Sequence, residues 1–156
     1  MKKTVVIHHH LGLGDHIICN GLINHISVSK KIYLICKLQY YKNIKYLYQD
    51  NNNVKIIPLA KFMTKSIKTE KKFSKIVSLC LLTTIKYIGF KQEEGDYFDK
   101  LFYKQVDIDF KHRYMSFHVP NDSENMILVP DSKFRLIHKE SSLGNYDLKI
   151  KSDDLT

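Results

Sequence analysis

Apolar residues fall into short β-branched runs that alternate with segments of helical spacing. The runs at 4–7, 31–36 and 54–59 have the length and composition of buried strands. A fourth candidate strand, residues 83–90, ends in Gly89 and Phe90.

Helical patterns separate these runs. After Asp15, apolar or small residues recur at the three- and four-residue spacing of one helix face; they are Ile17, Ile18, Gly21, Leu22, His25 and Ile26. Residues 40–48 predict a second helix, closed by the turn-forming run at 50–53. Strands that alternate with helices favour βαβ units. We therefore predict an α/β, Rossmann-like parallel sheet with helices on both faces.

The later segments are less regular. Residues 61–75 are rich in lysine, and 73–82 form an apolar stretch that fits a helix or a strand. Residues 96–106 predict a helix, and 126–130 one more strand before a polar tail. We predict one domain over 1–125. Residues 126–156 are then the stub of a truncated second domain or a flexible tail, because about 30 residues are too few to form a domain.

Composition adds a marked charge asymmetry. The chain has 156 residues and a net charge of +9, yet 1–92 contain 16 lysines against three acidic groups, whereas 93–156 contain nine basic against 13 acidic groups. Only two of the 25 basic residues are arginines. Because nucleic-acid readers rely on arginine forks, no nucleic-acid partner is expected.

Cysteine usage and hydropathy indicate the compartment. The three cysteines, Cys19, Cys36 and Cys80, are far apart and fit neither a disulfide framework nor a zinc site, so we expect them to be reduced and structural. No window reaches the roughly 18 apolar residues of a membrane span. We expect a cytoplasmic protein, with peripheral attachment to a membrane left open.

The first strand runs into the segment His8-His9-His10-Leu11-Gly12-Leu13-Gly14-Asp15. A Gly-x-Gly-Asp turn before a helix presents backbone N–H groups to an anion or a sugar hydroxyl, and both glycines permit close approach and positive φ. A dinucleotide fingerprint would need glycine where Ile17 stands, and a Walker loop would need Gly-Lys-Ser/Thr.

Asp15 has two interpretations. As the first residue of the helix it caps the N-terminus. As a carboxylate at the carboxyl edge of a parallel sheet, it lies where open α/β folds bind ligands and accepts a proton from an attacking hydroxyl.

The histidines suggest a metal site, but strand alternation lets His8 and His10 converge while His9 points away. We expect no metal. Instead, one or two imidazoles are expected to hydrogen-bond a polar ligand or the turn backbone.

Residues 8–23 resemble the N-terminal turn of bacterial and viral polysaccharide-cluster proteins related to heptosyltransferases, which have the two-domain GT-B glycosyltransferase fold. Residues 98–114 are similar to a helix and loop of the same group. The resemblance implies that Asp15 is the general base in the acceptor cleft and that Gly12 and Gly14 border it. Around them we expect a substrate-binding set of Gly12, Leu13, Gly14, His10, His16 and Asn20.

The resemblance also implies an inverting, metal-independent transfer from a nucleotide-sugar donor, with no other cofactor. The donor lies mainly on the second GT-B domain, of which residues 126–131 resemble only the beginning. We therefore expect no independent catalysis. Three alternatives stay open: the chain binds a sugar or glycan acceptor, it is a degenerate remnant, or it pairs with a separately encoded donor-binding domain. This chain departs from the family at two places. Gly21 stands where the family commonly has proline, and histidines precede the loop in place of an arginine or lysine. The identity of the family's substrates therefore does not carry over to this chain.

The alternative is a non-enzymatic binding module. In that interpretation the lysine-rich face of 61–75 contacts an anionic membrane surface or polysaccharide. A solvated loop explains the same lysines.

Overall fold

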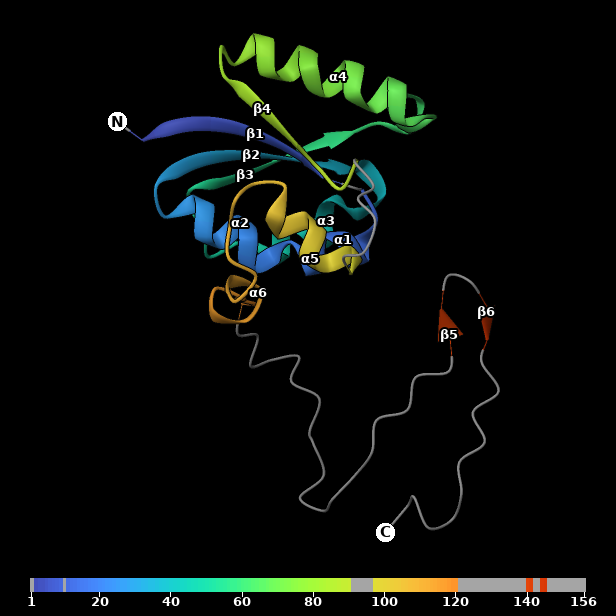
Figure 1. Cartoon of the computed structure of the whole chain (residues 1–156). Coiled ribbons are helices and arrows are strands. Elements are labelled where there is room, and N and C mark those ends of the chain that lie inside the picture. Colours follow the sequence, from blue (N-terminus) through green and yellow to red (C-terminus); the bar gives the residue numbers. More distant parts are fainter. Residues whose placement is uncertain (1, 10, 91–96, 121–139, 142–143, 146–156) are drawn as a thin grey trace. The chain divides into compact units, whose positions relative to one another are not determined.

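The computed structural model describes residues 2–9, 11–90, 97–120, 140–141 and 144–145 (Figure 1). The chain divides into two compact units, Met1–Asn121 and Asp122–Thr156. In the second unit, β5 (Glu140–Ser141) and β6 (Gly144–Asn145) form a short antiparallel pair. The strand predicted at 126–130 lies outside the described residues.

The first unit is built on a four-stranded sheet in which every strand is parallel to its neighbours. Its strands are β1 (Lys3–His9), β2 (Lys30–Lys37), β3 (Val54–Leu59) and β4 (Thr84–Ile88), in the order β3-β2-β1-β4. Helices cover both faces (Figure 1). The predicted α/β, Rossmann-like fold is therefore confirmed, and each of the four strands forms where β-branched and apolar residues predicted it.

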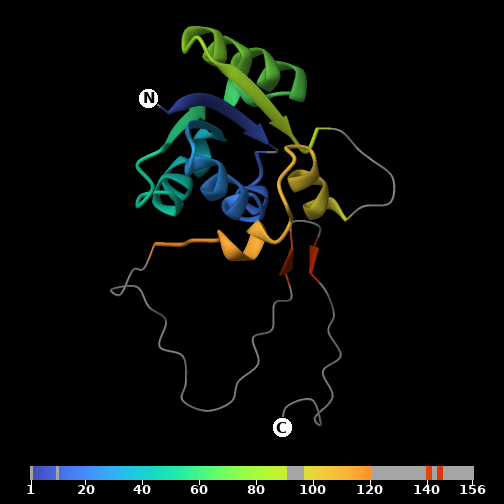
Figure 2. The ribbon, with the colours of Figure 1, turned by 60° about the vertical axis from the view of Figure 1, so that its left-hand side comes forward.

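One face of the sheet carries most of the helices, and both views show the same layering (Figures 1 and 2). The helices on this face are α1 (Leu13–Ile18), α2 (Asn20–Ser27), α3 (Tyr41–Leu47) and α5 (Phe98–Lys104). They share the main core with inward side chains of all four strands, among them Ile7, Leu34, Val54 and Ile88.

The opposite face is covered by one helix, α4 (Ile67–Cys80). Its smaller core joins buried strand residues such as Val6 and Ile35 to half-buried residues of α4, including Phe73 and Val77. Three short elements complete the unit: the 3₁₀ turns η1 (Leu38–Tyr40) and η2 (Lys61–Thr64), and α6 (His112–Met115). Among the described residues, no helix has the length and hydrophobicity to cross a membrane.

The α4 helix resolves the ambiguous middle segment. Ser66 begins the helix, because its side chain accepts a hydrogen bond from the Thr69 N–H at 3.2 Å. The stretch at 73–82 is thus mainly the second half of a helix, and it leads into β4.

The predicted first helix differs from the observed one. The structure has two helices, with Cys19 between them, and α1 begins at Leu13 rather than at Asp15. Ile17 is 48% exposed, so its place on a buried face was wrong. His16 and Cys19 turn inward instead. The rest of the predicted face is confirmed where it matters for packing: Gly21, Leu22 and Ile26 are buried, and Ile18 packs against the main core.

Candidate functional site

The strand order reverses direction between β1 and β4, so the chain connections diverge at the carboxyl ends of these two strands. From β1 the chain proceeds through β2 to β3, then crosses through α4 to β4 on the other side of β1. His9 and Ile88 lie opposite each other in the register, so the two strands end side by side. In open α/β sheets, ligands bind where the chain connections diverge in this way.

The β4 side of this edge is fixed by Gly89. Its φ of 82° is one that side chains disfavour, which lets the chain turn away from the strand. Its N–H donates to Oε1 of Gln105, the residue that ends α5, at 2.6 Å. The end of α5 is therefore held beside the carboxyl edge.

Asp15 lies on the β1 side, in the first turn of α1. It is the third residue of the helix and is half-buried. Its Oδ2 accepts a hydrogen bond from the Gly12 N–H at 3.2 Å. Asp15 therefore caps the helix, as one interpretation predicted, although from the third position rather than the first. A carboxylate has about four lone-pair sites, so this bond and a bond from a ligand hydroxyl are compatible.

The two glycines of the turn differ. A Cβ at Gly12 would lie 2.6 Å from Asp15 Oδ2, whereas a Cβ at Gly14 would meet nothing within 4 Å. Gly12 has a φ of −73° and Gly14 is helical, so neither uses the positive φ that the sequence permits. Gly12 is required for close approach of the carboxylate, and Gly14 is a solvent-exposed helix residue.

His9 and His16 form a buried pair behind the turn. Both are fully buried, with ring centroids 4.2 Å apart in an edge-to-face arrangement. Burial, and secondly the neighbouring His9, lowers the pKa of His16 well below its usual range. His16 is therefore neutral near pH 7. Because its side chain is fully buried, it does not face solvent at the turn. His10, also predicted to bind substrate, lies outside the described residues.

His8 points to the opposite face, as strand alternation predicts. Its Nδ1 lies 2.9 Å from Ser74 Oγ, and Ser74 gives its hydroxyl proton to the Lys71 carbonyl at 3.1 Å. Nδ1–H of His8 is therefore the donor to Ser74. Its Nε2 lies 3.9 Å from Oε2 of the buried Glu70.

Sequence reasoning missed this cluster of His8, Glu70 and Ser74. One signal was available: Glu70, Ser74 and Ser78 recur at four-residue spacing along α4, and all three are buried. Polar residues in a stripe that faces the sheet indicate a partner there. The strand alternation supplies His8 as that partner.

Two other predicted residues belong to the packing of the fold. Asn20 is fully buried, and its Oδ1 accepts hydrogen bonds from the His118 N–H at 2.8 Å and from Asn24 Nδ2 at 3.1 Å. Leu13 is half-buried against the main core. The structure thus places Gly12, Gly14 and Asp15 together at the edge, while the described contacts of Asn20 are structural. A substrate contact of Asn20 stays a prediction.

The three cysteines differ in burial. Cys19 and Cys36 are buried, and Cys80 is exposed. Burial raises the pKa of the Cys36 thiol to about 12. Within the described ranges, no three or more His, Cys, Asp or Glu side chains are arranged to hold a metal ion.

Comparison with protein-family models, with curated proteins and with solved structures yields no match to the chain.

Proposed function

We propose that the first unit is the acceptor-binding half of a GT-B glycosyltransferase related to the heptosyltransferases. The observation that supports it best is the position of Asp15, a half-buried carboxylate in the first turn of α1, the helix that follows β1, on the β1 side of the edge where β1 and β4 end together. The resemblance of 8–23 to that family agrees with this position. The ligand is a sugar or glycan acceptor.

In this proposal Asp15 is the general base. Its carboxylate accepts the proton of an acceptor hydroxyl as that oxygen attacks the anomeric carbon of a nucleotide sugar. The new C–O bond forms as the bond to the departing nucleoside diphosphate breaks, with inversion at the sugar carbon. The bond from the Gly12 N–H orients the carboxylate before the acceptor arrives.

The proposal requires a donor-binding domain beside this unit. The departing diphosphate carries developing negative charge, which needs hydrogen-bond donors or cations positioned around it. In GT-B enzymes the second domain supplies them, and we propose that a separately encoded domain does so here. We also propose that the protein lies in the cytoplasm, as expected from the sequence, because nucleotide sugars are made there.

The experiment is a sugar-binding screen with a matched pair of variants. Glucose, galactose, mannose, N-acetylglucosamine and their 6-phosphates are titrated into the whole chain and followed by saturation-transfer NMR. Asp15→Asn weakens binding of the preferred sugar about tenfold or more, because a hydrogen bond to a charged group is lost. Asp107→Asn is the control, since Asp107 is exposed with a φ of 58°, a conformation that asparagine also adopts.

Two outcomes would contradict the proposal. One is that none of these sugars binds. The other is that Asp15→Asn and Asp107→Asn bind the preferred sugar equally well. In either case Asp15 is a helix cap alone.

A further inference from the structure

The outer face of α4 carries both positive charge and apolar side chains. Glu70, Ser74 and Ser78 turn inward to the sheet. On the opposite side of the helix, Lys68, Lys72 and Lys75 alternate with exposed Ile76 and Leu79. The helix thus turns an acidic side chain and two hydroxyl side chains toward the sheet, and lysines with apolar side chains toward water.

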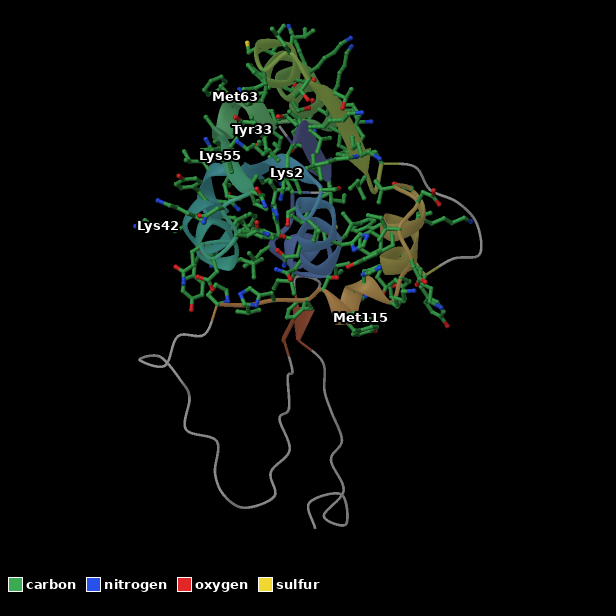
Figure 3. The ribbon with its side chains drawn as sticks, turned by 90° about the vertical axis from the view of Figure 1, so that its left-hand side faces the viewer. Lys2, Tyr33, Lys42, Lys55, Met63 and Met115 are labelled. Atoms are coloured by element: carbon green, nitrogen blue, oxygen red, sulfur yellow. The ribbon has the colours of Figure 1, made fainter. Side chains whose placement is uncertain are left out.

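No exposed acidic residue within 54–90 offsets this charge. This segment contains eight lysines and one acidic residue, Glu70, which is buried. The same face of the sheet adds Lys55, which is exposed and pairs in register with Tyr33. Figure 3 shows Tyr33, Lys55 and Met63 near one another beside α4. Lys55 also lines a pocket with Lys45 of α3, so the positive face that is separate from α3 is that of α4 itself.

Leu82 gives the strongest sign of an apolar partner. It follows α4 with a φ of 48°, a conformation that normally selects glycine or asparagine after a helix. Its side chain is 94% exposed, and its N–H donates to the Leu79 carbonyl at 3.0 Å. Leu79, itself 63% exposed, lies one turn before it. Two leucines are thus held in water at the end of a lysine-rich helix.

We propose that the outer face of α4, with Leu79 and Leu82 at its end, docks on an anionic lipid bilayer. Lysines near such a surface are attracted to its headgroups, and apolar side chains on the same face enter the interfacial region. A polysaccharide or a nucleic acid would pair with the lysines but leave both leucines in water. The bilayer is the partner that satisfies both kinds of side chain, and this inference does not depend on the proposed glycosyltransferase activity.

Cys80 provides a probe on this face. It is exposed at the end of α4, whereas Cys19 and Cys36 are buried, so a thiol-reactive, polarity-sensitive dye labels Cys80 selectively in the folded chain. The labelled protein is titrated with vesicles of three parts phosphatidylcholine to one part phosphatidylglycerol, and with vesicles of phosphatidylcholine alone. The dye emission shifts to the blue only with the anionic vesicles.

Three variants separate charge, apolar contact and folding. Lys68→Gln with Lys72→Gln lowers the vesicle affinity about 30-fold, at roughly a factor of five per lysine near the surface. Lys42→Gln with Lys45→Gln removes the same charge from exposed positions of α3, on the opposite face of the sheet, and changes affinity little. Leu82→Asn suits the observed φ, so the fold keeps its stability while vesicle binding weakens severalfold.

Three results would overturn the proposal. The first is an equal dye response to anionic and neutral vesicles, or no response to either. The second is an equal loss of affinity in the α3 and α4 lysine pairs. The third is binding to soluble heparin that matches vesicle binding and is unchanged in Leu82→Asn, which would assign the face to a soluble polyanion.

Discussion

Gly12 and Gly14 share one turn, but a Cβ would meet another side chain only at Gly12. A methyl group at Gly12 would lie 2.6 Å from Asp15 Oδ2, and at Gly14 it would meet open space. We therefore expect Gly12→Ala to displace the Asp15 carboxylate and lower the free energy of unfolding by about 1 kcal/mol, the value of a helix cap. Urea unfolding measures the change.

Gly14→Ala is the matched control. Because alanine favours helix over glycine, this variant gains up to about 1 kcal/mol in the free energy of unfolding. Equal stabilities for the two variants would show that Asp15 does not depend on the Gly12 position.

His16 predicts a pH dependence of stability. Burial lowers its pKa in the folded state, so the unfolded chain binds more protons once the pH falls below the ordinary value of about 6.5. The free energy of unfolding therefore falls with decreasing pH, by up to about 1.4 kcal/mol per pH unit for this one group. This loss continues down to the lowered pKa of the folded state.

Replacing His16 with leucine removes that contribution. We expect His16→Leu to lose less stability than the wild type between pH 7 and pH 5, measured by urea unfolding at each pH. Parallel stability curves for the two proteins would mean that His16 does not titrate differently in the folded and unfolded states.

Among the elements, the crossing of α2 and α6 depends on one glycine. A Cβ at Gly21 would lie 2.1 Å from the His112 carbonyl oxygen and 3.0 Å from Arg113 Cα. In this chain, glycine lets α6 approach α2 closely enough for the His118 N–H to reach Asn20.

We expect Gly21→Ala to separate the two helices and lower the free energy of unfolding by about 1–3 kcal/mol, as overpacking does. Urea unfolding reports the loss, and amide chemical shifts over 112–118 report the movement of α6. An alanine variant with wild-type stability and unchanged shifts would show that the crossing is not tightly packed.

The boundaries of the helices were harder to predict than the positions of the strands. The β-branched runs gave all four strands of the sheet, because buried parallel strands are nearly continuous apolar segments. The helix over α4 mixes lysines with isolated apolar residues, and only its packing against one face of the sheet shows which side is inward. The break at Cys19 has no apolar signal at all, since polar His16 and Asn20 are buried around it.

For the whole molecule, the sequence predicted the fold class and the position of Asp15 but not the cluster on the other side of β1. Asp15 lies in the first turn of the helix that follows β1, so local order alone places it near the carboxyl edge. His8 and Ser74 are 66 positions apart and meet only because the crossover through α4 returns the chain beside β1. Such a contact depends on strand order, which residue spacing does not encode.

The most direct test of the account is to locate a bound sugar on the chain. Amide chemical shifts of the whole chain are recorded while the sugar that binds best in the screen is titrated in. The account predicts that the largest shifts fall at Gly12, Asp15 and Gly89, on the two strand ends that meet at the carboxyl edge. Shifts confined to α3, α6 or the amino edge of the sheet would contradict it.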